Sequence, residues 1–199
     1  SRRLSDPLDF TPRKGLEHSL RLLSITDNLS GLYNQRYFYA TLSQEIARSS
    51  RYGYPFSLVC IDMDKFKTVN DTLGHLEGDN LITHLGSLIR NELRSADLGF
   101  RYGGDEFMLI LPQTGREKAA LVAERLRKAF YDTATGTLQN RPQSLPCLTL
   151  SIGIVVYIDG DPEEQFIRSG ELLKQADMAM YQAKKNGGNR VVMAQPADQ

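Results

Sequence analysis

Apolar positions along the chain follow two different periods, and these periods alternate from one segment to the next. Spacing by three and four residues indicates amphipathic helices, whereas short runs rich in Val, Ile, Leu and Phe indicate buried strands. We expect helices over residues 16–25, 34–51, 65–72, 75–93, 116–131 and 169–185, and strands over residues 56–62, 98–102, 106–111, 148–157 and 190–193. Helices and strands therefore alternate around one hairpin, which predicts an α/β or α+β fold with helices packed on a central sheet.

The predicted hairpin reads RYGGDEF at residues 101–107, with two glycines followed by two acids. Glycine readily adopts the positive φ angles of a tight hairpin turn, so we expect such angles at Gly103 and Gly104. Asp105 and Glu106 place adjacent negative charges at the same turn. Acidic residues in turns are often simply solvated, so this stretch alone leaves a surface turn and a functional site equally open.

A third acid, Asp62, ends the apolar run FSLVCID at residues 56–62. A sheet can bring this strand end beside the hairpin, where three carboxylates would repel one another unless a cation lay between them. Hard oxygen ligands without His or Cys favour Mg²⁺ or Mn²⁺. The alternative role of Asp62 is to cap the helix that follows.

The chain contains neither a GxxxxGK[ST] phosphate loop nor a GxGxxG fingerprint. A helix that starts near Lys65 would instead offer the free N–H groups of its first turn to an anion, with Lys67 beside them. An ordinary exposed helix lysine is the alternative interpretation of Lys67.

Composition sets limits on partners and location. Lys plus Arg and Asp plus Glu number 24 each, so no overall charge favours nucleic acid or an anionic membrane, and an anionic ligand would need local charge. No apolar run approaches the roughly 18 residues of a membrane helix. We therefore expect a soluble cytoplasmic segment, which could have been cut from a longer membrane-bound chain, with a tail and lead-in helix at residues 1–26 and one domain at 27–195. Cys60 and Cys147 lie in apolar stretches and are expected to be buried structural thiols.

Taken together, these segments resemble the GGDEF family of diguanylate cyclases. RYGGDEF is the signature of that family, and DNLSGLYNQR at residues 27–36 resembles its N-terminal motif DxLTGLxNRR. DMDKFK followed by VND within residues 62–71 is similar to its metal and phosphate segment. Gly74-His75 and Gly78-Asp79 continue that segment, and SIGI at 151–154 and residues 176–184 are similar to the closing motifs.

The resemblance implies a palm-like, mostly antiparallel sheet surrounded by helices, related to nucleotidyl cyclase and polymerase palm domains. It implies an enzyme that condenses two GTP molecules into cyclic di-GMP with release of pyrophosphate, and two Mg²⁺ or Mn²⁺ ions at each GTP site. The metal ligands would be Asp62, the Met63 carbonyl, Asp105 and Glu106. Asp105 and Glu106 would be catalytic, and Asp105 would also assist deprotonation of the attacking 3′-hydroxyl.

The substrate contacts follow from the same resemblance: Lys65, Phe66, Lys67, Asn70, Asp79, Gly103, Gly104 and Lys184. Of these, Asn70 and Asp79 would bind the guanine edge, and Lys67 and Lys184 the phosphates. An acid at Asp79 suits guanine because it can accept from the ring N1–H and the exocyclic amine. Turn and cap duty is the alternative for Asn70 and Asp79.

Arg94 and Asp97 stand at the position of the family's inhibitory RxxD motif. The resemblance implies that cyclic di-GMP binds there as an inhibitor, with Arg125 as a secondary contact. A surface ion pair at i, i+3 is the alternative. Because each domain presents one GTP site and the product needs two nucleotides, activity implies a homodimer, which we expect an upstream sensor region outside this sequence to assemble.

The chain departs from the family pattern at one position. The family commonly reads AKxxGRN where this chain reads AKKNGGN at residues 183–189, so Gly188 replaces an arginine. Loss of one such phosphate contact costs about 1–3 kcal/mol, which predicts weaker GTP binding unless Lys185 substitutes. Two alternatives to a diguanylate cyclase stay open: a non-catalytic GGDEF-like module that binds cyclic di-GMP or GTP and regulates a partner, and an enzyme that forms a mixed GMP-AMP product.

Overall fold

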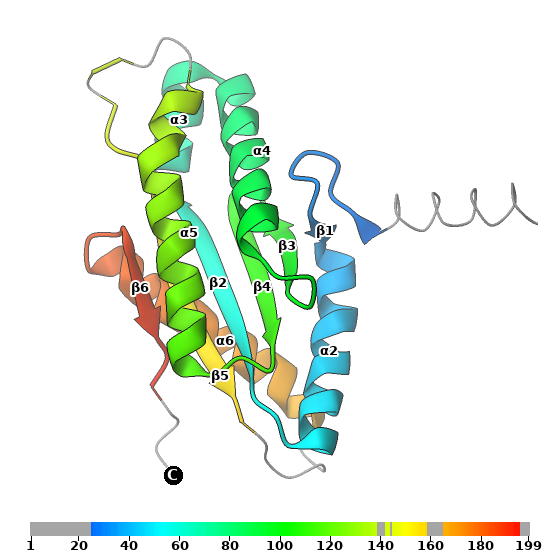
Figure 1. The fold of residues 1–199 in the computed structure, drawn as a ribbon. Helices are drawn as coiled ribbons and strands as arrows, with labels where there is room; N and C mark the ends of the chain where they lie inside the picture. Colours follow the sequence, from blue (N-terminus) through cyan, green and yellow to red (C-terminus); the bar gives the residue numbers. More distant parts are fainter. Residues whose placement is uncertain (1–24, 139–141, 144, 159–164, 196–199) are drawn as a thin grey trace, which may run out of the picture.

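The computed structural model describes residues 25–138, 142–143, 145–158 and 165–195 (Figure 1). Its strands are β1 (Tyr33–Asn34), β2 (Phe56–Asp64), β3 (Leu98–Gly103), β4 (Glu106–Pro112), β5 (Thr149–Tyr157) and β6 (Arg190–Met193). Its helices are α2 (Gln35–Tyr52), α3 (Phe66–Leu73), α4 (His75–Glu92), α5 (Arg116–Thr137) and α6 (Gln165–Lys185).

The six strands form one sheet in the order β1-β3-β4-β2-β5-β6. The β1–β3 and β5–β6 pairs are parallel, and the three central pairs are antiparallel. The mostly antiparallel sheet predicted from the sequence is therefore confirmed, with β2 at its centre between β4 and β5.

Helices cover both faces of this sheet, and the alternation of side chains along β2 separates two cores. Val59 and Ile61 point into a core shared with α4 and α5, whereas Leu58 and Cys60 point into a core shared with α2 and α6. Figure 1 shows α4 and α5 in front of the sheet and α6 behind it. Asp62 has the same parity as Cys60 and so lies on the α6 side.

The close approach of α6 to the sheet depends on Gly153. A Cβ atom at this position in β5 would lie 2.1 Å from the Ala176 carbonyl oxygen and 2.2 Å from the Met180 nitrogen. Gly153 is paired with Cys60 of β2, and the Cys60 Sγ lies 3.4 Å from the Met180 Sδ. Glycine at this point therefore lets the backbone of α6 rest directly on the two central strands.

The predicted elements from residue 34 onward are confirmed, and three boundaries shift by two residues or more, while the others agree to within one residue. β2 runs two residues further, to Asp64; α5 continues to Thr137; and α6 already begins at Gln165. The two-residue strand β1 was not predicted, because so short a segment carries no periodicity. The predicted tail and lead-in helix lie outside the described residues, except for Ile25 and Thr26.

Two local predictions are wrong. Gly103 and Gly104 are not among the residues with positive φ, because a bulge between Arg101 and Gly103 lets ordinary backbone angles close the turn. Cys147 is exposed, because it lies two residues before β5 begins at Thr149 and so outside the buried strand, whereas Cys60 is buried as predicted. Within the described ranges, no helix combines the length and the apolar character that crossing a membrane would require.

Candidate active site

The three acids singled out in the sequence come together at one end of the sheet. The antiparallel register of β2 and β4 places Asp62 directly opposite Glu106. Asp105 lies in the turn before Glu106, and its carbonyl accepts a hydrogen bond of 3.4 Å from the Met63 nitrogen. The strand end and the hairpin are thus joined by backbone pairing, which fixes the three residues as neighbours.

Asp62 is 5% exposed, and its carboxylate is paired with a lysine. Lys184 Nζ lies 2.5 Å from Asp62 Oδ2. Burial raises the pKa of Asp62 to about 6; the hydrogen bond and charge of Lys184 oppose this, and the charges of Asp105 and Glu106 add to it. Burial lowers the pKa of Lys184, but the hydrogen bond and charge of Asp62, with Asp105 and Asp64 behind it, outweigh burial and raise it.

Lys184 reaches Asp62 because a helix and a strand advance by similar steps. Met180 of α6 contacts Cys60 of β2. Four helical residues further, at Lys184, the chain has risen about 6 Å, and two strand residues further, at Asp62, it has risen about 6.7 Å. The packing of Met180 on Cys60 therefore places Lys184 beside Asp62.

The donor set fits a hard divalent cation in its chemistry. Asp62, Asp105 and Glu106 offer carboxylate oxygens, and the Met63 side chain is buried in the α4 and α5 core, so only its backbone could serve as a ligand. In the part of the chain that the structure describes, no three acidic, His or Cys side chains form a ready-made metal-binding group. The cation that meets Asp62 here is the ammonium of Lys184.

A cavity of about 630 Å³ opens beside Asp62 and Asp105, whereas Glu106 is not part of its lining. Its lining comes from the end of β2, the first turn of α3, the hairpin, the approach to β5 and the end of α6: Asp62, Met63, Asp64, Lys65, Phe66, Lys67, Thr68, Asp105, Pro146, Cys147, Thr149, Lys184, Gly187, Gly188 and Asn189. Of the predicted substrate contacts, Lys65, Phe66, Lys67 and Lys184 line the cavity, whereas Asn70, Asp79, Gly103 and Gly104 are not part of this lining.

The start of α3 faces this cavity. Lys65 occupies the N-cap position with φ 65°, in the left-handed region, and makes no side-chain cap hydrogen bond. Helix geometry leaves the N–H groups of Phe66, Lys67 and Thr68 without intrahelical acceptors. Lys67 is exposed beside them. The cavity thus has a cationic lysine and free helix amides on the side next to Asp62, an arrangement that suits phosphate.

Asn70 carries an unusual polar atom. Its Oδ1 is buried, and among the described residues it meets no hydrogen-bond donor. A Cβ atom at Gly78 would lie 2.0 Å from this Oδ1, so Gly78 allows α3 and α4 to approach closely here. Asp79 follows Gly78 on α4 and is exposed. Asn70 thus offers an acceptor that meets no donor among the described residues, and Asp79 follows the glycine that lies against it.

The glycine-rich turn is held by an arginine that the sequence did not single out for a role. Arg101 Nε and Nη2 donate to the Gly104 carbonyl at 3.1 and 2.9 Å, and its Nη1 donates to Asp27 at 3.2 Å. Burial raises the pKa of Asp27, but hydrogen bonds from Ser30 and the charge of Arg101 lower it overall. Asp27 is the first residue of the N-terminal motif and Arg101 the first residue of RYGGDEF. Their places in these two motifs were the one sequence feature that could have indicated a role for them.

On the other flank of the turn, Tyr102 packs edge-on against Phe38 of α2 and its hydroxyl meets that of Tyr39. Burial raises the pKa of Tyr102 to about 12, and the hydroxyl of Tyr39 adds to this. Gly104 is open, since a Cβ atom there would meet nothing within 4 Å. The hairpin is thus anchored on both sides while its tip stays clear.

Asp64 organises the end of the chain around the cavity. Its carboxylate accepts hydrogen bonds from Thr149 Oγ1 at 2.6 Å, Ser151 Oγ at 2.7 Å and the Asn189 nitrogen at 3.0 Å. Gly188 has φ 71°, and a Cβ atom there would lie 2.7 Å from Asp64 Oδ2. A side chain at residue 188 would therefore strain the backbone and press on the Asp64 carboxylate. The signal for Asp64 was its alternation with Asp62, which puts both on one face of β2.

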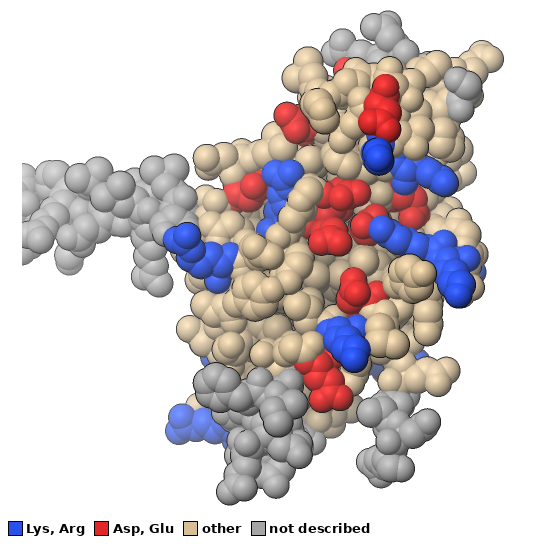
Figure 2. Space-filling model, turned by 180° about the vertical axis from the view of Figure 1, so that it is seen from behind, with Lys and Arg blue, Asp and Glu red and all other residues tan. Residues whose placement is uncertain are grey.

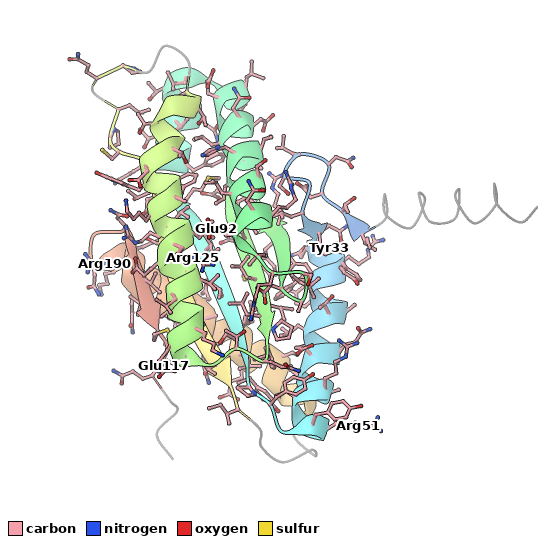
Figure 3. The ribbon with its side chains drawn as sticks, viewed as in Figure 1. Tyr33, Arg51, Glu92, Glu117, Arg125 and Arg190 are labelled. Carbon is pink, nitrogen blue, oxygen red and sulfur yellow. The ribbon has the colours of Figure 1, made fainter. Side chains whose placement is uncertain are left out.

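The predicted inhibitory residues lie apart from this cavity. Arg94 donates through Nε and Nη2 to Asp97 at 3.1 and 3.0 Å, and through Nη2 to Thr114 at 2.9 Å. A cavity of about 390 Å³ adjoins them, lined by Thr26, Gly31, Leu32, Tyr33, Arg90, Leu93, Arg94, Ser95, Asp97 and Gly99. Arg125 does not line it but reaches from α5 to Glu92 of α4 at 3.1 Å (Figure 3).

Surface charge is mixed rather than of one sign. Figure 2 shows acidic side chains grouped near the middle of the face opposite to that of Figure 1, with Lys and Arg side chains around them. This agrees with the equal numbers of acidic and basic residues in the sequence. Positive charge that could attract an anion is therefore found at individual places, such as Lys67 and Lys184 in the lining of the larger cavity.

Comparison with known proteins gives a consistent result. Residues 24–190 match the family model for "Diguanylate cyclase, GGDEF domain". The chain is 38% identical over 181 residues to the response regulator PleD of Caulobacter vibrioides, covering 90% of this chain and 38% of PleD, and 36% identical over 165 residues to the diguanylate cyclase DosC of Escherichia coli, covering 83% of this chain and 34% of DosC. It thus spans between a third and two fifths of the length of these relatives.

Solved structures agree with the sequence matches. The coiled coil and GGDEF domain of DgcB from Caulobacter crescentus, in complex with c-di-GMP, superposes with a TM-score of 0.79 at 30% identity and covers 92% of each chain. Diguanylate cyclase SiaD of Pseudomonas aeruginosa, in complex with its activator SiaC, superposes with a TM-score of 0.74 at 35% identity, over 92% of this chain and 66% of that one. The palm-like fold predicted from the sequence is thereby confirmed.

Proposed function

Because the chain belongs to the GGDEF family of diguanylate cyclases, we propose that it condenses two molecules of GTP into cyclic di-GMP with release of pyrophosphate, acting as a homodimer. One observation carries the proposal. Asp62, Asp105 and Glu106 meet at the sheet end beside a cavity whose other wall is the start of α3, with Lys67 and Lys184 at its border.

Each group in this arrangement has a task in phosphoryl transfer, which depends mainly on positioning and charge stabilisation. Asp62, Asp105, Glu106 and the Met63 carbonyl would hold two Mg²⁺ or Mn²⁺ ions. Such ions neutralise the triphosphate and lower the pKa of the attacking 3′-hydroxyl. Asp105, at the turn, would assist removal of the proton from that hydroxyl.

The remaining contacts orient the nucleotide. The N–H groups of Phe66 and Lys67 and the ammonium groups of Lys67 and Lys184 would bind the phosphates. The buried Oδ1 of Asn70, which meets no donor among the described residues, supports a contact with an N–H of guanine. Asp79 would accept from the N1–H and the amine of the same base. The open space at Gly104 supports approach of the nucleotide to the hairpin.

Two further properties belong to the same proposal. Each domain holds one GTP site, so two copies must face each other for the two 3′-hydroxyls to attack. We also place product inhibition at Arg94 and Asp97, where the Arg94 guanidinium is partly exposed and adjoins a cavity. Crystal structures of DgcB contain c-di-GMP, which supports binding of this dinucleotide to the family fold.

The deciding experiment is product identification. The protein is incubated with GTP and Mg²⁺, and separately with equal GTP and ATP, and the products are identified by mass. Cyclic di-GMP from the first mixture, and loss of that product in Glu106→Gln, are expected. Glu117→Gln, an exposed change at the start of α5, is the matched control. Absence of any dinucleotide at high protein concentration would favour a non-catalytic binding module, and a GMP-AMP product would favour altered nucleotide choice.

A further inference from the structure

We propose that Lys184 is the resident counter-ion of the acidic site: a divalent ion can bind Asp62 only by displacing the Lys184 ammonium, which then turns to the phosphates in the adjoining cavity. This rests on the proposed function, because it assumes that Asp62 is a metal ligand. It adds that Lys184 exchanges one partner, the Asp62 carboxylate, for another, a nucleotide phosphate. It therefore predicts that metal and nucleotide bind cooperatively.

The first support is the contact itself. Lys184 Nζ lies 2.5 Å from Asp62 Oδ2, while the Asp62 side chain is only 6% exposed. A buried carboxylate without a cation is costly, so the ammonium satisfies a need that a metal ion would otherwise meet. A divalent ion on the same carboxylate would lie within a few ångströms of the ammonium and repel it strongly. The two cations therefore exclude each other.

The second support is the freedom of the lysine side chain. Its side chain is 38% exposed and lines the cavity of about 630 Å³, so the ammonium has space to move into. Its backbone, by contrast, is fixed, because α6 packs on β5 without a gap at Gly153. The exchange thus needs a change of side-chain rotamer and no movement of the helix.

The third support is the occupation of the neighbouring acid. Asp64 also lies on this face, but its carboxylate already accepts from Thr149, Ser151 and the Asn189 nitrogen. Once displaced from Asp62, the ammonium is therefore directed to an anion in the cavity rather than to Asp64. A nucleotide phosphate supplies that anion, so nucleotide lowers the cost of displacing Lys184 and favours the metal.

The test measures Mn²⁺ binding to the whole chain without nucleotide, by the electron paramagnetic resonance signal of free Mn²⁺. Lys184→Met keeps the stem and removes the charge, and we expect it to bind Mn²⁺ about tenfold or more tightly than the wild type. Lys184→Arg keeps a cation and should bind Mn²⁺ as weakly as the wild type. Lys174→Met, an exposed lysine on the same helix, is the matched control and should change nothing.

A second arm tests the coupling. In the wild type, a non-hydrolysable GTP analogue should tighten Mn²⁺ binding, and in Lys184→Met this gain should shrink, because there is no ammonium left to displace. Thermal unfolding of each variant checks that it is folded.

The outcomes separate this inference from the proposed function. If Asp62→Asn abolishes Mn²⁺ binding while Lys184→Met binds Mn²⁺ no more tightly than the wild type, the metal site stands and the exchange is wrong. If Asp62→Asn leaves Mn²⁺ binding unchanged, the metal site itself is wrong and the exchange falls with it.

Discussion

Arg101 and Asp27 are 74 positions apart in the sequence, yet Arg101 Nη1 donates a hydrogen bond of 3.2 Å to Asp27 Oδ2. The same guanidinium donates through Nη2 to the Gly104 carbonyl of the hairpin turn. The pair is mostly buried, with side-chain exposures of 18% and 24%. A charge-assisted contact of this kind is stronger than a surface ion pair. The turn that carries Asp105 is therefore tied to the segment that enters the domain.

Replacement of Arg101 should loosen this turn. Arg101→Ala removes the donors to Gly104 and Asp27, and we expect the free energy of unfolding to fall by about 1–3 kcal/mol. The rate of product formation should also fall, and by more than the loss of folded protein explains, because Asp105 loses its fixed position. Urea unfolding and turnover of GTP measure the two effects. Lys118→Ala, at an exposed position of α5, should change neither.

The contrast between Asp105 and Arg101 shows what the sequence could and could not reveal. The acids of RYGGDEF were identified because this stretch is the signature of the GGDEF family; as acids in a turn they would have left a solvated surface turn equally open. Arg101 and Asp27 were not assigned a role, because their contact joins residues with no common period or spacing. The positive φ angles expected at Gly103 and Gly104 were wrong for a related reason: the bulge in β3 is decided by strand pairing, not by the two glycines.

Helices and the central strands were predictable because each has a continuous apolar face. The position of Lys184 over Asp62 was not predictable, because it depends on the distance between α6 and the sheet. That distance is set by the absent side chain of Gly153, which sequence periodicity does not register. The family resemblance named Lys184 as a phosphate contact, and the structure adds its pairing with a carboxylate.

Gly153→Ala should therefore be strongly destabilising. The added Cβ would overlap the Ala176 carbonyl and the Met180 nitrogen, which are backbone atoms and cannot rotate away. We expect a loss of about 1–3 kcal/mol or more in the free energy of unfolding. Gly170→Ala is the matched control on α6, because its Cβ would meet nothing within 4 Å, and it should be neutral or slightly stabilising. Equal effects of the two changes in thermal unfolding would refute this account of the packing.

We expect the buried Glu45 to make the stability of the fold depend on pH. Its side chain is 3% exposed; its Oε1 meets no donor among the described residues, and Arg48 lies 3.7 Å from Oε2. Burial raises the pKa of Glu45, and Arg48 and the Tyr54 hydroxyl lower it only in part. The folded state then holds this proton more tightly than the unfolded state does, so the stability it contributes is present at low pH and is lost as pH rises through the folded pKa.

Glu45→Gln removes this titration. We expect the variant to melt at a higher temperature than the wild type at pH 7.5. The difference should shrink as the pH falls and vanish well below pH 4.5, the ordinary pKa of glutamate, where the residue is protonated in both states. Glu171→Gln, an exposed change on α6, is the control. A difference that is constant from pH 4 to pH 8 would mean that the amide acts through packing rather than through charge.

Product inhibition should depend on Arg94. Arg94→Ala removes the guanidinium beside the cavity of about 390 Å³, and we expect inhibition of turnover by added cyclic di-GMP to be largely lost. The buried Asp97 also loses its partner, so Arg94→Lys, which keeps a charge but not the bidentate geometry, is measured beside it. Arg125→Ala should weaken inhibition less, because Arg125 is paired with Glu92 and does not line the cavity. Unchanged inhibition in Arg94→Ala would place the inhibitor elsewhere.

Gly188 replaces an arginine of the family pattern, and the structure changes what a substitution there can test. Its φ is 71°, and a Cβ atom added to it would lie 2.7 Å from Asp64 Oδ2, so any side chain at this position strains the turn. The N–H groups of Gly187 and Gly188 already donate to the carbonyls of Lys184 and Ala183, so these two amides are not free to bind a phosphate. Gly188→Ala should therefore lower the melting temperature and raise the KM for GTP.

The value of an arginine at this position must then be judged against alanine rather than against the wild type. Both variants carry the strain of a Cβ atom, so a lower KM for GTP in Gly188→Arg than in Gly188→Ala isolates the contribution of the guanidinium. We expect such a difference of about tenfold, the effect of one charge-assisted hydrogen bond to phosphate. Equal KM values in the two variants would show that residue 188 does not reach the nucleotide. Its role would then be to allow the backbone to approach Asp64 closely.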